Sequence, residues 1–545
     1  MCGILAVIGK SDSSMAQKES FKMGHRGPDE RGVYTDPVHQ RTLCHERLSI
    51  NDLTTGRQPL KGCSGAHLIH NGEIYNHHQL WDGLKSTHTH CSESDSEIIL
   101  HLWEEMGEQC VSLLDGVFAF ILLDGAKVFV ARDPIGVKPL YYGIDEDGDL
   151  WFASETKSLV GPCEKIEEFP PGHYYTLESG FVKYYTPKWK EAPEDIPSAG
   201  ADKIRASLEA SVRKRLMSDV PLGVLLSGGL DSSLVSSIVA REMKGSEAKV
   251  KSFSVGVSKD AHDMVAARKV ADFIGTEHHD VVFSVEQGIE HIKETILKIE
   301  TYDVTTIRCS IPMLIMSKYI KDQGVKVVLS GEGADEIFGG YLYFNEAPCP
   351  AEFHKECVRR IDFLHKSDVL RADRATMGAG VEARVPFLDL DFLKDSMEVD
   401  PRLKESKFGS RIEKYVLRKA FDTPQSPYLP DSILWRQKEQ FQDGVGYSWV
   451  DGLKEYCEQA ITDGEFKRRH LFYPHNTPRT KEAFLYRKIF EELFDHHEAT
   501  KLTQKWIPKW QEHDEDPSGR ASKYHKKSHH TQEEESEEEI EVLAI

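Results

Sequence analysis

The first 185 residues alternate short apolar runs with turns, a pattern typical of a β-rich domain. Apolar or alternating runs predict strands at residues 4–8, 67–70, 117–123, 128–131 and 151–153. An Asp-Gly pair between the third and fourth runs is a hairpin signal. One helix is predicted at residues 94–106, where four apolar side chains share a face. Residues 2–186 are therefore predicted to form an α+β domain, an antiparallel sheet sandwich flanked by helices.

From Asp202 onward, helix and strand patterns alternate. Strands are predicted at residues 224–226, 250–257, 280–283 and 325–329, and helices at 230–243 and 263–274. This alternation indicates an α/β domain over residues 202–514 with a doubly wound parallel sheet. Helical patterns dominate from about residue 350 to residue 500. The proline-containing stretch 187–201 predicts a linker between the two domains.

The end of the chain is strongly acidic. Residues 526–545 contain two Lys and seven Glu, a net charge of −5. Like charges repel, and few side chains there can be buried, so residues 515–545 are predicted to be mostly disordered. The net charge of the whole chain is −21, which disfavours a nucleic-acid partner.

Composition indicates the cellular compartment in which we expect the protein. Hydrophobic residues make up 39% of the 545 positions, and no run reaches the roughly 18 apolar residues of a membrane helix. Lys10, Asp12 and Lys18 interrupt the N-terminus too early for a signal peptide. Ten cysteines without a CxxC pair argue against a zinc site and a disulfide scaffold. We expect a cytoplasmic protein without a membrane partner, and a homodimer is compatible with the sequence.

Cys2 is the strongest candidate nucleophile. Removal of Met1 would place a thiol and a free α-amine on one residue, and the amine has a reference pKa of about 7.7–8. The amine can take the thiol proton, and the thiolate is the attacking species. Position alone favours an accidental N-terminal cysteine, so further residues must decide.

Three further features fit hydrolysis of an amide. Arg47 suits a bidentate grip on a carboxylate, although a single Arg is more often a surface residue. Asn71 and Gly72 follow a strand and could donate to an oxyanion or form an ordinary turn. Asp95 could bind an ammonium group or cap a helix.

In this order, the first-half motifs resemble the N-terminal-nucleophile glutamine amidotransferase domain. The matching stretches are residues 2–4, 25–29, 47–50, 71–76 and 94–95. The resemblance implies glutamine as substrate, Cys2 as nucleophile, and Asn71 and Gly72 as oxyanion donors. It implies a glutamine-binding set of Arg47, Leu48, Ile50, Asn71, Gly72, Glu73 and Asp95.

The second half contains a small-residue loop at 227–233, Ser-Gly-Gly-Leu-Asp-Ser-Ser, between a predicted strand and a helix. Backbone N–H groups and the helix N-terminus can bind phosphate there, and the GxxxxGK[ST] pattern is absent. The loop resembles the pyrophosphate-binding loop of ATP pyrophosphatases. A second cluster at 330–336, Ser-Gly-Glu-Gly-Ala-Asp-Glu, also follows a strand, so we expect it at the same sheet edge.

With residues 300–308, 380–389 and 435–441, the two loops resemble glutamine-dependent asparagine synthetase of the two-domain kind. The resemblance implies ATP and Mg²⁺, aspartate as acceptor, and a β-aspartyl-AMP intermediate attacked by ammonia, with Glu332 as general base. The implied ATP-binding residues are Leu226, Ser227, Gly228, Gly229, Asp231, Ser232, Val255, Ser330 and Gly331. The implied aspartate and pyrophosphate residues are Thr305, Thr306, Arg308, Asp335, Arg384 and Lys438, with Asp231 and Asp335 as metal ligands.

Two segments depart from the family pattern, residues 495–500 and 258–263. Three alternatives stay open: another synthetase on the same frame, an enzyme that amidates a different carboxylate, and a non-catalytic binding protein. Retention of Cys2, Asp231 and Glu332 weighs against the last, because a binding protein has no need of these groups.

Overall fold

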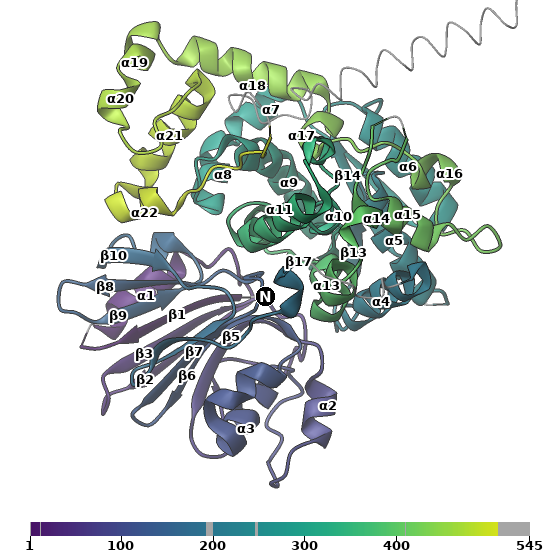
Figure 1. Cartoon of the computed structure of the whole chain (residues 1–545). Coiled ribbons are helices and arrows are strands. Elements are labelled where there is room, and N and C mark those ends of the chain that lie inside the picture. Colours follow the sequence, from purple (N-terminus) through teal and green to yellow (C-terminus); the bar gives the residue numbers. More distant parts are fainter. Residues whose placement is uncertain (1, 11, 192–199, 246–248, 409, 511–545) are drawn as a thin grey trace, which may run out of the picture.

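Two six-stranded antiparallel sheets face each other in the first half of the molecule (Figure 1). The computed structural model describes residues 2–10, 12–191, 200–245, 249–408 and 410–510. One sheet has the strand order β10-β8-β9-β1-β3-β2 and the other β12-β11-β7-β6-β5-β4. The strands are β1 Cys2–Ile8, β2 Glu30–Asp36, β3 Arg41–Arg47, β4 Leu60–Lys61, β5 His67–Ile74, β6 Gly116–Asp124, β7 Lys127–Arg132, β8 Tyr141–Asp145, β9 Leu150–Ala153, β10 Cys163–Glu168, β11 His173–Thr176 and β12 Gly180–Lys183.

The core of this half lies between the sheets. Inward side chains such as Ile4 and Leu43 meet Ile69, Ile121 and Val130 from the opposite sheet. The outer faces are covered by helices, so β6 is buried on both sides. The helical segments are α1 Ser13–Phe21, α2 His77–Asp82, α3 Glu97–Met106, and the 3₁₀ turns Gly107–Leu113, Thr156–Ser158 and Lys188–Lys190. The predicted sandwich flanked by helices is confirmed.

The predicted helix over 94–106 begins three residues late, at Glu97. Asp95 does not cap it, because its carboxylate accepts the backbone N–H of Ile74 at 2.7 Å. The five predicted strands are all present, with bounds shifted by up to four residues. The seven remaining strands escaped prediction because many of their side chains are charged or partly exposed, as in the burial pattern of β2.

The second half contains a five-stranded parallel sheet of order β15-β14-β13-β16-β17. Helices cover both faces, since Val224 and Leu329 pack with α4, α5 and α6, whereas Phe253 and Val328 pack with α8 and α9. The strands are β13 Leu222–Leu225, β14 Lys251–Gly256, β15 Glu277–Val282, β16 Val327–Leu329 and β17 Glu382–Arg384. The predicted doubly wound sheet is confirmed.

The helices of this half account for most of its chain. Those around the sheet are α4 Ala201–Lys214, α5 Leu230–Glu242, α6 His262–Ile274, α7 Val285–Glu290, α8 Ile292–Ile299, α9 Val304–Asp322, α10 Ala334–Phe338, α11 Pro350–Phe363, α12 Asp368–Met377 and α13 Leu390–Met397. They are followed by α14 Pro401–Lys404, α15 Tyr415–Phe421, α16 Asp431–Leu434, α17 Phe441–Gly444, α18 Tyr447–Ala460, α19 Asp463–Lys467, α20 Arg469–Phe472, α21 Lys481–Phe494 and α22 His497–Leu502. Three 3₁₀ turns are Leu342–Glu346, Leu364–Lys366 and Pro386–Leu388. Every helix that the structure describes is too short or too polar to cross a lipid bilayer.

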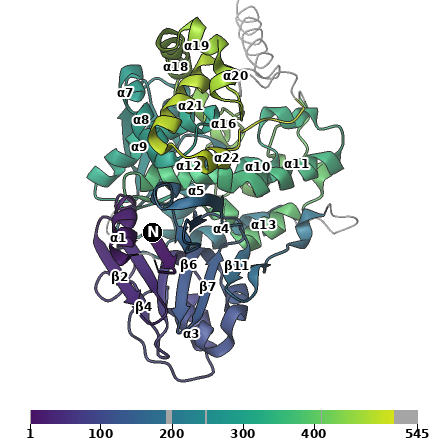
Figure 2. The same cartoon turned by 90° about the vertical axis from the view of Figure 1, so that its left-hand side faces the viewer.

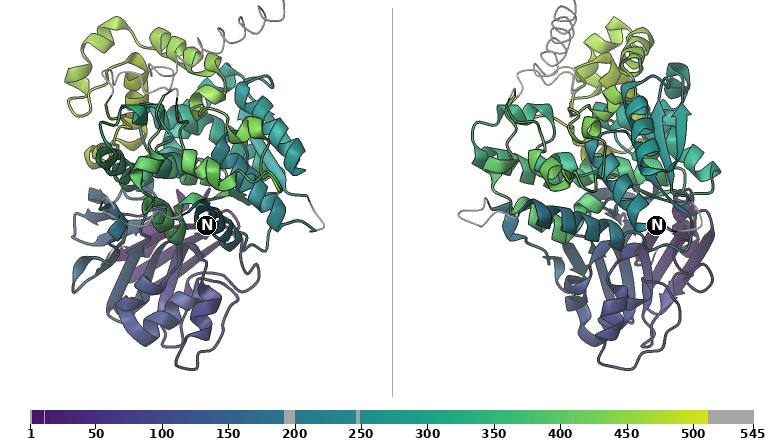
Figure 3. Two further views of the ribbon diagram at one scale, coloured as in Figure 1. Left: turned by 45° about the vertical axis from the view of Figure 1, so that its right-hand side comes forward. Right: turned by 90° about the vertical axis from the view of Figure 1, so that its right-hand side faces the viewer.

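The two halves stack end to end and meet along one broad contact (Figures 2 and 3). Leu48 and Ile50 from the first half pack against Val327 and Met377 from the second. The Glu300 carboxylate accepts the backbone N–H of Thr156 at 2.8 Å, so charged groups also join the halves.

The structure describes part of the predicted linker and the whole of the divergent segment after Phe494. In the predicted linker, Trp189 is buried in the core of the second half, and residues 192–199 lie outside the described residues. The divergent segment after Phe494 forms α22, and His496 Nε2 donates to the Cys163 carbonyl at 2.9 Å, docking it on the first half. The predicted disordered tail, 515–545, lies outside the described residues.

Candidate active sites

Cys2 lies where the two sheets of the first half converge. It begins β1 and pairs with Arg47 at the end of β3. Its backbone N–H donates to Asn71 Oδ1 at 2.9 Å, a contact that reaches into the opposite sheet. Only 6% of the Cys2 surface is exposed. The sandwich therefore holds the predicted nucleophile against the predicted oxyanion donor.

Asn71 and Gly72 offer donors at this point. Because Asn71 Oδ1 accepts from Cys2, the Asn71 Nδ2 group is left as a buried donor without a hydrogen-bond partner. A buried unpaired donor is costly unless a ligand satisfies it. At Gly72 a Cβ would lie 2.0 Å from the Val117 carbonyl oxygen, so only glycine fits.

His45 is a functional candidate that the sequence reasoning missed. Burial alone would raise the pKa of the Cys2 thiol, but the neighbouring His45 imidazole, the positive charge of the chain's N-terminus and the Leu48 backbone N–H lower it to about 6. His45 is fully buried, and its Nε2 donates to the His70 carbonyl oxygen at 3.2 Å. Its spacing from Arg47 was the available signal, because residues two apart on a strand share a face.

The predicted glutamine-binding residues surround this point with internal partners of their own. Arg47 donates from Nη1 to Glu30 Oε2 at 2.6 Å and from Nη2 to the Asp52 carbonyl at 2.5 Å. Burial raises the pKa of Glu73 and of Asp95. Such buried carboxylates would be stabilised as anions by a bound ammonium group.

Leu48 and Ile50, also predicted to bind glutamine, lie at the contact between the two halves. Both are buried in the apolar contact between the halves, 3% and 2% exposed. Leu48 also reaches the Cys2 thiol with its backbone N–H. These residues thus connect the surroundings of the thiol with the second half.

The second half contains a cavity of about 140 Å³ where β13, β14 and β16 end. Ligands bind at this edge of open parallel sheets. Eleven predicted residues line it: Leu226, Ser227, Asp231, Ser232, Val255, Thr305, Ser330, Gly331, Glu332, Asp335 and Lys438. An adjoining cavity of about 60 Å³ includes Gly229.

The loop before α5 is organised around two serines. Ser227 and Ser232 join their hydroxyl groups at 2.9 Å, so the loop closes onto the N-terminus of α5. That N-terminus favours a phosphate group. Gly228 does not line either described cavity; it has φ +74°, and a Cβ there would lie 2.4 Å from the Ala267 backbone nitrogen.

Asp231 and Asp335 are held together by Lys414, a second residue that the sequence reasoning missed. Lys414 Nζ forms ion pairs with Asp231 and with Asp335, and Lys438 Nζ lies 3.1 Å from Asp335 Oδ2. The two lysines outweigh burial and lower the pKa of Asp335 to about 2. Asp231 Oδ1 is buried without a hydrogen-bond partner. Two adjacent carboxylates with a spare oxygen fit Mg²⁺, which prefers oxygen ligands.

Glu332 meets Arg371, which also escaped prediction. Arg371 Nη2 lies 3.0 Å from Glu332 Oε2 and 3.0 Å from Asp368 Oδ1. Burial raises the pKa of Glu332 although Arg371 opposes the shift. A carboxylate with a raised pKa that faces a cavity is a better proton acceptor than an ordinary one, which fits a general base.

Comparison with known proteins matches a different family model to each half of the chain. Residues 1–179 match the family model for a glutamine amidotransferase domain, and residues 203–352 and 346–516 match that for asparagine synthase. A probable glutamine-hydrolysing asparagine synthetase of Dictyostelium discoideum is 49% identical over 556 residues, covering 96% of this chain and 99% of that protein. Asparagine synthetase 1 of Arabidopsis thaliana is 49% identical over 553 residues, covering 96% and 94%. The chain belongs to the glutamine-hydrolysing asparagine synthetase family.

Three residues predicted for aspartate or pyrophosphate do not line the cavity of this asparagine synthetase. On α9 the lining positions are Thr305, Cys309, Met313 and Met316, one face of the helix. Thr306 lies off that face and donates to Asp303 Oδ2 at 2.8 Å, and Arg308 donates to both Glu482 oxygens at 2.8 and 2.6 Å.

Arg384, the third, lies at the contact between the halves. Its Nε donates to Glu382 Oε1 at 2.5 Å, and its Nη2 lies 3.3 Å from Glu73 Oε1. Ser330 also donates its backbone N–H to the Arg384 carbonyl at 2.9 Å. Arg384 therefore contacts both Glu73, a predicted glutamine-binding residue, and Ser330, a predicted ATP-binding residue.

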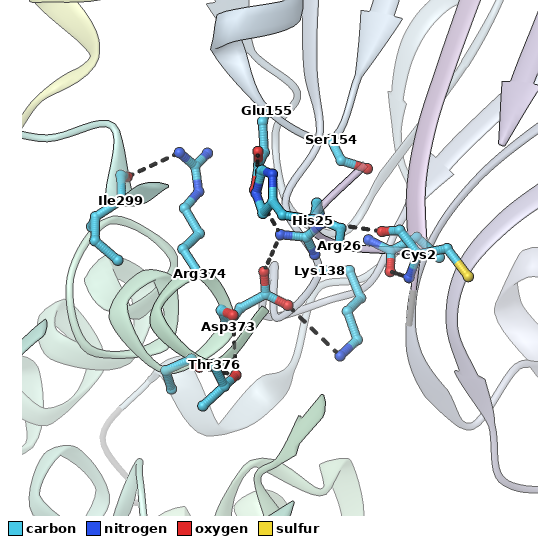
Figure 4. A network of polar contacts seen from close by, with 12 residues as sticks. Cys2, His25, Arg26, Lys138, Ser154, Glu155, Ile299, Asp373, Arg374 and Thr376 are labelled. Atoms are coloured by element: carbon cyan, nitrogen blue, oxygen red, sulfur yellow. Dashed lines mark hydrogen bonds and ion pairs between the residues drawn. The ribbon is translucent and has the colours of Figure 1, made fainter. Parts of the chain in front are cut away.

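A charged network joins Cys2 to the second half (Figure 4). Arg26 Nε donates to the Cys2 carbonyl at 3.0 Å, and Arg26 Nη1 pairs with Glu155 at 3.0 Å and Asp373 at 2.9 Å. Asp373 belongs to α12, which also carries Arg371, the partner of Glu332. One helix thus contacts the surroundings of both sites in the asparagine synthetase.

Proposed function

We propose that this asparagine synthetase amidates aspartate in two coupled half-reactions, one at Cys2 and one in the cavity of the second half. Glutamine, aspartate and ATP are its substrates. The observation that carries the proposal is the path from Cys2 through Arg26 and Asp373 to α12 and Glu332. It couples a buried thiol of lowered pKa with a cavity suited to a nucleotide.

In the first half-reaction, the Cys2 thiolate attacks the side-chain amide carbon of glutamine. Asn71 Nδ2 and the Gly72 N–H stabilise the oxyanion, and the α-amine freed by loss of Met1 passes the proton to departing ammonia. Water then hydrolyses the thioester to glutamate. Arg47 binds the substrate α-carboxylate, and Glu73 and Asp95 bind its ammonium group. His45 favours the thiolate form of Cys2 by lowering the pKa of the thiol.

In the second half-reaction, a β-carboxylate oxygen of aspartate attacks the α-phosphorus of ATP, and pyrophosphate leaves. Ammonia attacks the β-aspartyl-AMP carbonyl, Glu332 accepts a proton, and AMP leaves. Leu226 and Val255 flank the adenine, and Ser330 and Gly331 contact the nucleotide. Ser227, Gly228, Gly229 and Ser232 form the phosphate loop.

Asp231 and Asp335 would hold Mg²⁺, which would neutralise charge on the pyrophosphate. Thr305 and Lys438 bind aspartate and phosphate oxygens from the cavity wall. Because Thr306, Arg308 and Arg384 point elsewhere, we assign them a role through their neighbours: Thr306 orders the start of α9, Arg308 anchors it to Glu482, and Arg384 positions Ser330 and Glu73.

An isotope experiment tests the adenylate. Aspartate labelled with ¹⁸O in the β-carboxylate would transfer one labelled oxygen to AMP, because that oxygen bonds to the α-phosphorus and leaves with it. Label in pyrophosphate or free phosphate would refute the assignment. A reaction without aspartate should yield no amidated product, which separates this function from amidation of another carboxylate.

The proposed location is the cytoplasm, where a reducing environment suits ten cysteines that are all free. The predicted homodimer stays a prediction, which analytical ultracentrifugation would check.

A further inference from the structure

A group of metal-ligand side chains lies outside both sites, at α2 and α3, the end of the first half far from the second (Figure 1). Cys63, His88, His101 and Glu104 each direct one ligand atom to a common point, and these atoms all lie within 4.8 Å of one another. Cys63 follows β4, His88 lies between α2 and α3, and the other two are one turn apart on α3. The spacing follows no familiar motif, because three separate segments supply the ligands.

The distances within the group suit a single ion. Glu104 Oε2 lies 3.1 Å from His88 Nδ1 and 3.2 Å from His101 Nδ1. Nitrogen and oxygen ligands at about 2.0 Å from a tetrahedral zinc ion lie about 3.3 Å apart. Cys63 Sγ accepts the Thr89 backbone N–H at 3.5 Å, which orients the sulfur. The ligand atoms therefore need little movement to bind an ion.

Both imidazoles are held from behind by carboxylates. His101 Nε2 lies 3.2 Å from Glu97 Oε1, and His88 Nε2 lies 3.4 Å from Glu105 Oε1. Glu97 in turn accepts the Cys91 N–H at 2.8 Å, and Glu105 accepts the Ser86 N–H at 2.7 Å. Zinc-binding histidines usually donate their second N–H to such a carboxylate, which fixes the ring and leaves the other nitrogen for the metal.

Burial and charge also favour a cation at this point. The His88 and His101 side chains are 6% and 1% exposed, so both imidazoles are shielded from water. Glu97 and Glu104 lie beside the two ring nitrogens of His101, so negative charge faces this imidazole from both sides.

We propose that Cys63, His88, His101 and Glu104 form a binding site for one zinc ion. A thiolate, two imidazoles and one carboxylate match the ligands of zinc, whereas Mg²⁺ and Ca²⁺ prefer oxygen alone. Four protein ligands leave no open position, so the ion is structural. It would fasten the segment between α2 and α3, which includes Asp95, onto α3.

The test uses the full chain, stripped of metal by chelation and titrated with Zn²⁺ against a chromophoric chelator. The expected result is one zinc ion per chain with a Kd below about 1 µM. The double variant C63S/H88Q should lose roughly 100-fold or more in affinity. The matched control C349S/H291Q replaces an exposed cysteine and a partly exposed histidine elsewhere and should bind like the unmodified chain.

Cobalt gives a second readout that does not depend on the fold of the double variant. Co²⁺ in the unmodified chain should show a near-ultraviolet thiolate charge-transfer band, and C63S alone, at an exposed position, should lack it. Absence of stoichiometric zinc binding, or equal affinity in C63S/H88Q and the unmodified chain, would overturn the proposal. So would a cobalt band that persists in C63S.

Discussion

The thiol site of the first half and the cavity of the second half solve different problems with different scaffolds. The residues around Cys2 lie mostly on strands β1, β3 and β5 of the two packed sheets, whereas the cavity is lined by helices and loops beyond the ends of parallel strands. A reactive thiol needs groups held at fixed positions around it, which two packed sheets provide. Phosphate binding needs converging N–H groups and cations, which the sheet edge provides.

The charges follow the same division. Near Cys2, burial dominates, so the pKa of Glu73 and Asp95 is raised. In the cavity, lysines dominate, so the pKa of Asp335 falls to about 2. Burial therefore favours the protonated form of the carboxylates in the first site, whereas Asp335 in the second site is held ionised beside lysines. The difference shows that burial and pairing, and not residue type, set the state of each carboxylate.

The largest expected effect separates the two sites outright. C2A should lower glutamine-dependent asparagine synthesis by about 1,000-fold or more, since the nucleophile is lost. Synthesis from added ammonium should persist, because the cavity is untouched. The two rates are measured as asparagine formed from each nitrogen source. C44A is the control: burial raises the pKa of Cys44 to about 12, so both rates should be retained. Loss of both activities in folded C2A would contradict the separation.

The converse change acts in the cavity. E332Q keeps the shape of the side chain but removes the base, so asparagine formation should fall by roughly 100- to 10,000-fold. Glutamate release from glutamine should continue, because Cys2 is unaffected. Product analysis by chromatography measures both. E242Q alters an exposed pair with Arg213 and should change neither. Normal asparagine output from E332Q would remove Glu332 from the mechanism.

The pH dependence of thiol reactivity sharpens the comparison further. The thiolate forms as the pH rises through the thiol pKa, so alkylation of Cys2 by iodoacetamide should reach half its maximal rate near pH 6. In H45Q the midpoint should rise by roughly one to two pH units, because the largest of the contributions that lower the pKa is removed. H39Q, in the turn between β2 and β3, should leave the midpoint in place. An unmoved midpoint in H45Q would show that His45 has only a packing role.

A smaller effect on activity is expected from a change in the Arg26–Asp373 ion pair, which joins the two halves. D373N removes the charge that Arg26 meets from α12, so the two halves should couple less well. The ratio of glutamate to asparagine should rise a few-fold while glutaminase activity itself remains. Simultaneous assay of both products measures it, and D362N, at an exposed pair with Lys190, is the control. A ratio equal to that of the unmodified chain would mean that the network only stabilises the fold.

The smallest effect concerns the acidic tail. Truncation after Arg520 should leave both half-reactions unchanged and alter the free energy of unfolding by less than about 0.5 kcal/mol. The reason is that no predicted site residue lies there and its like charges repel. Thermal denaturation and the two assays check it. A large loss of stability or assembly would instead assign the tail a structural role.

Sequence alone determined the elements with strong periodicity and the residues with special backbone needs. The continuous apolar run at 117–123, the βα alternation after Asp202 and the loop at 227–233 have local causes, so they could be predicted. The assignment of Cys2, Asn71 and Asp231 to two sites rested on sequence motifs that resemble those of a known family. Edge strands such as β2 could not be predicted, because partly exposed strands lack a clear hydrophobic pattern.

Tertiary structure decided which side chains meet across long sequence separations. His45 beside Cys2, Lys414 between Asp231 and Asp335, and Arg371 against Glu332 each depend on packing of distant segments. Helix phase turned Arg308 away from the cavity, toward Glu482 on α21. The pattern along the chain sets local conformation, whereas partner choice, burial and therefore pKa arise only when separate elements pack together.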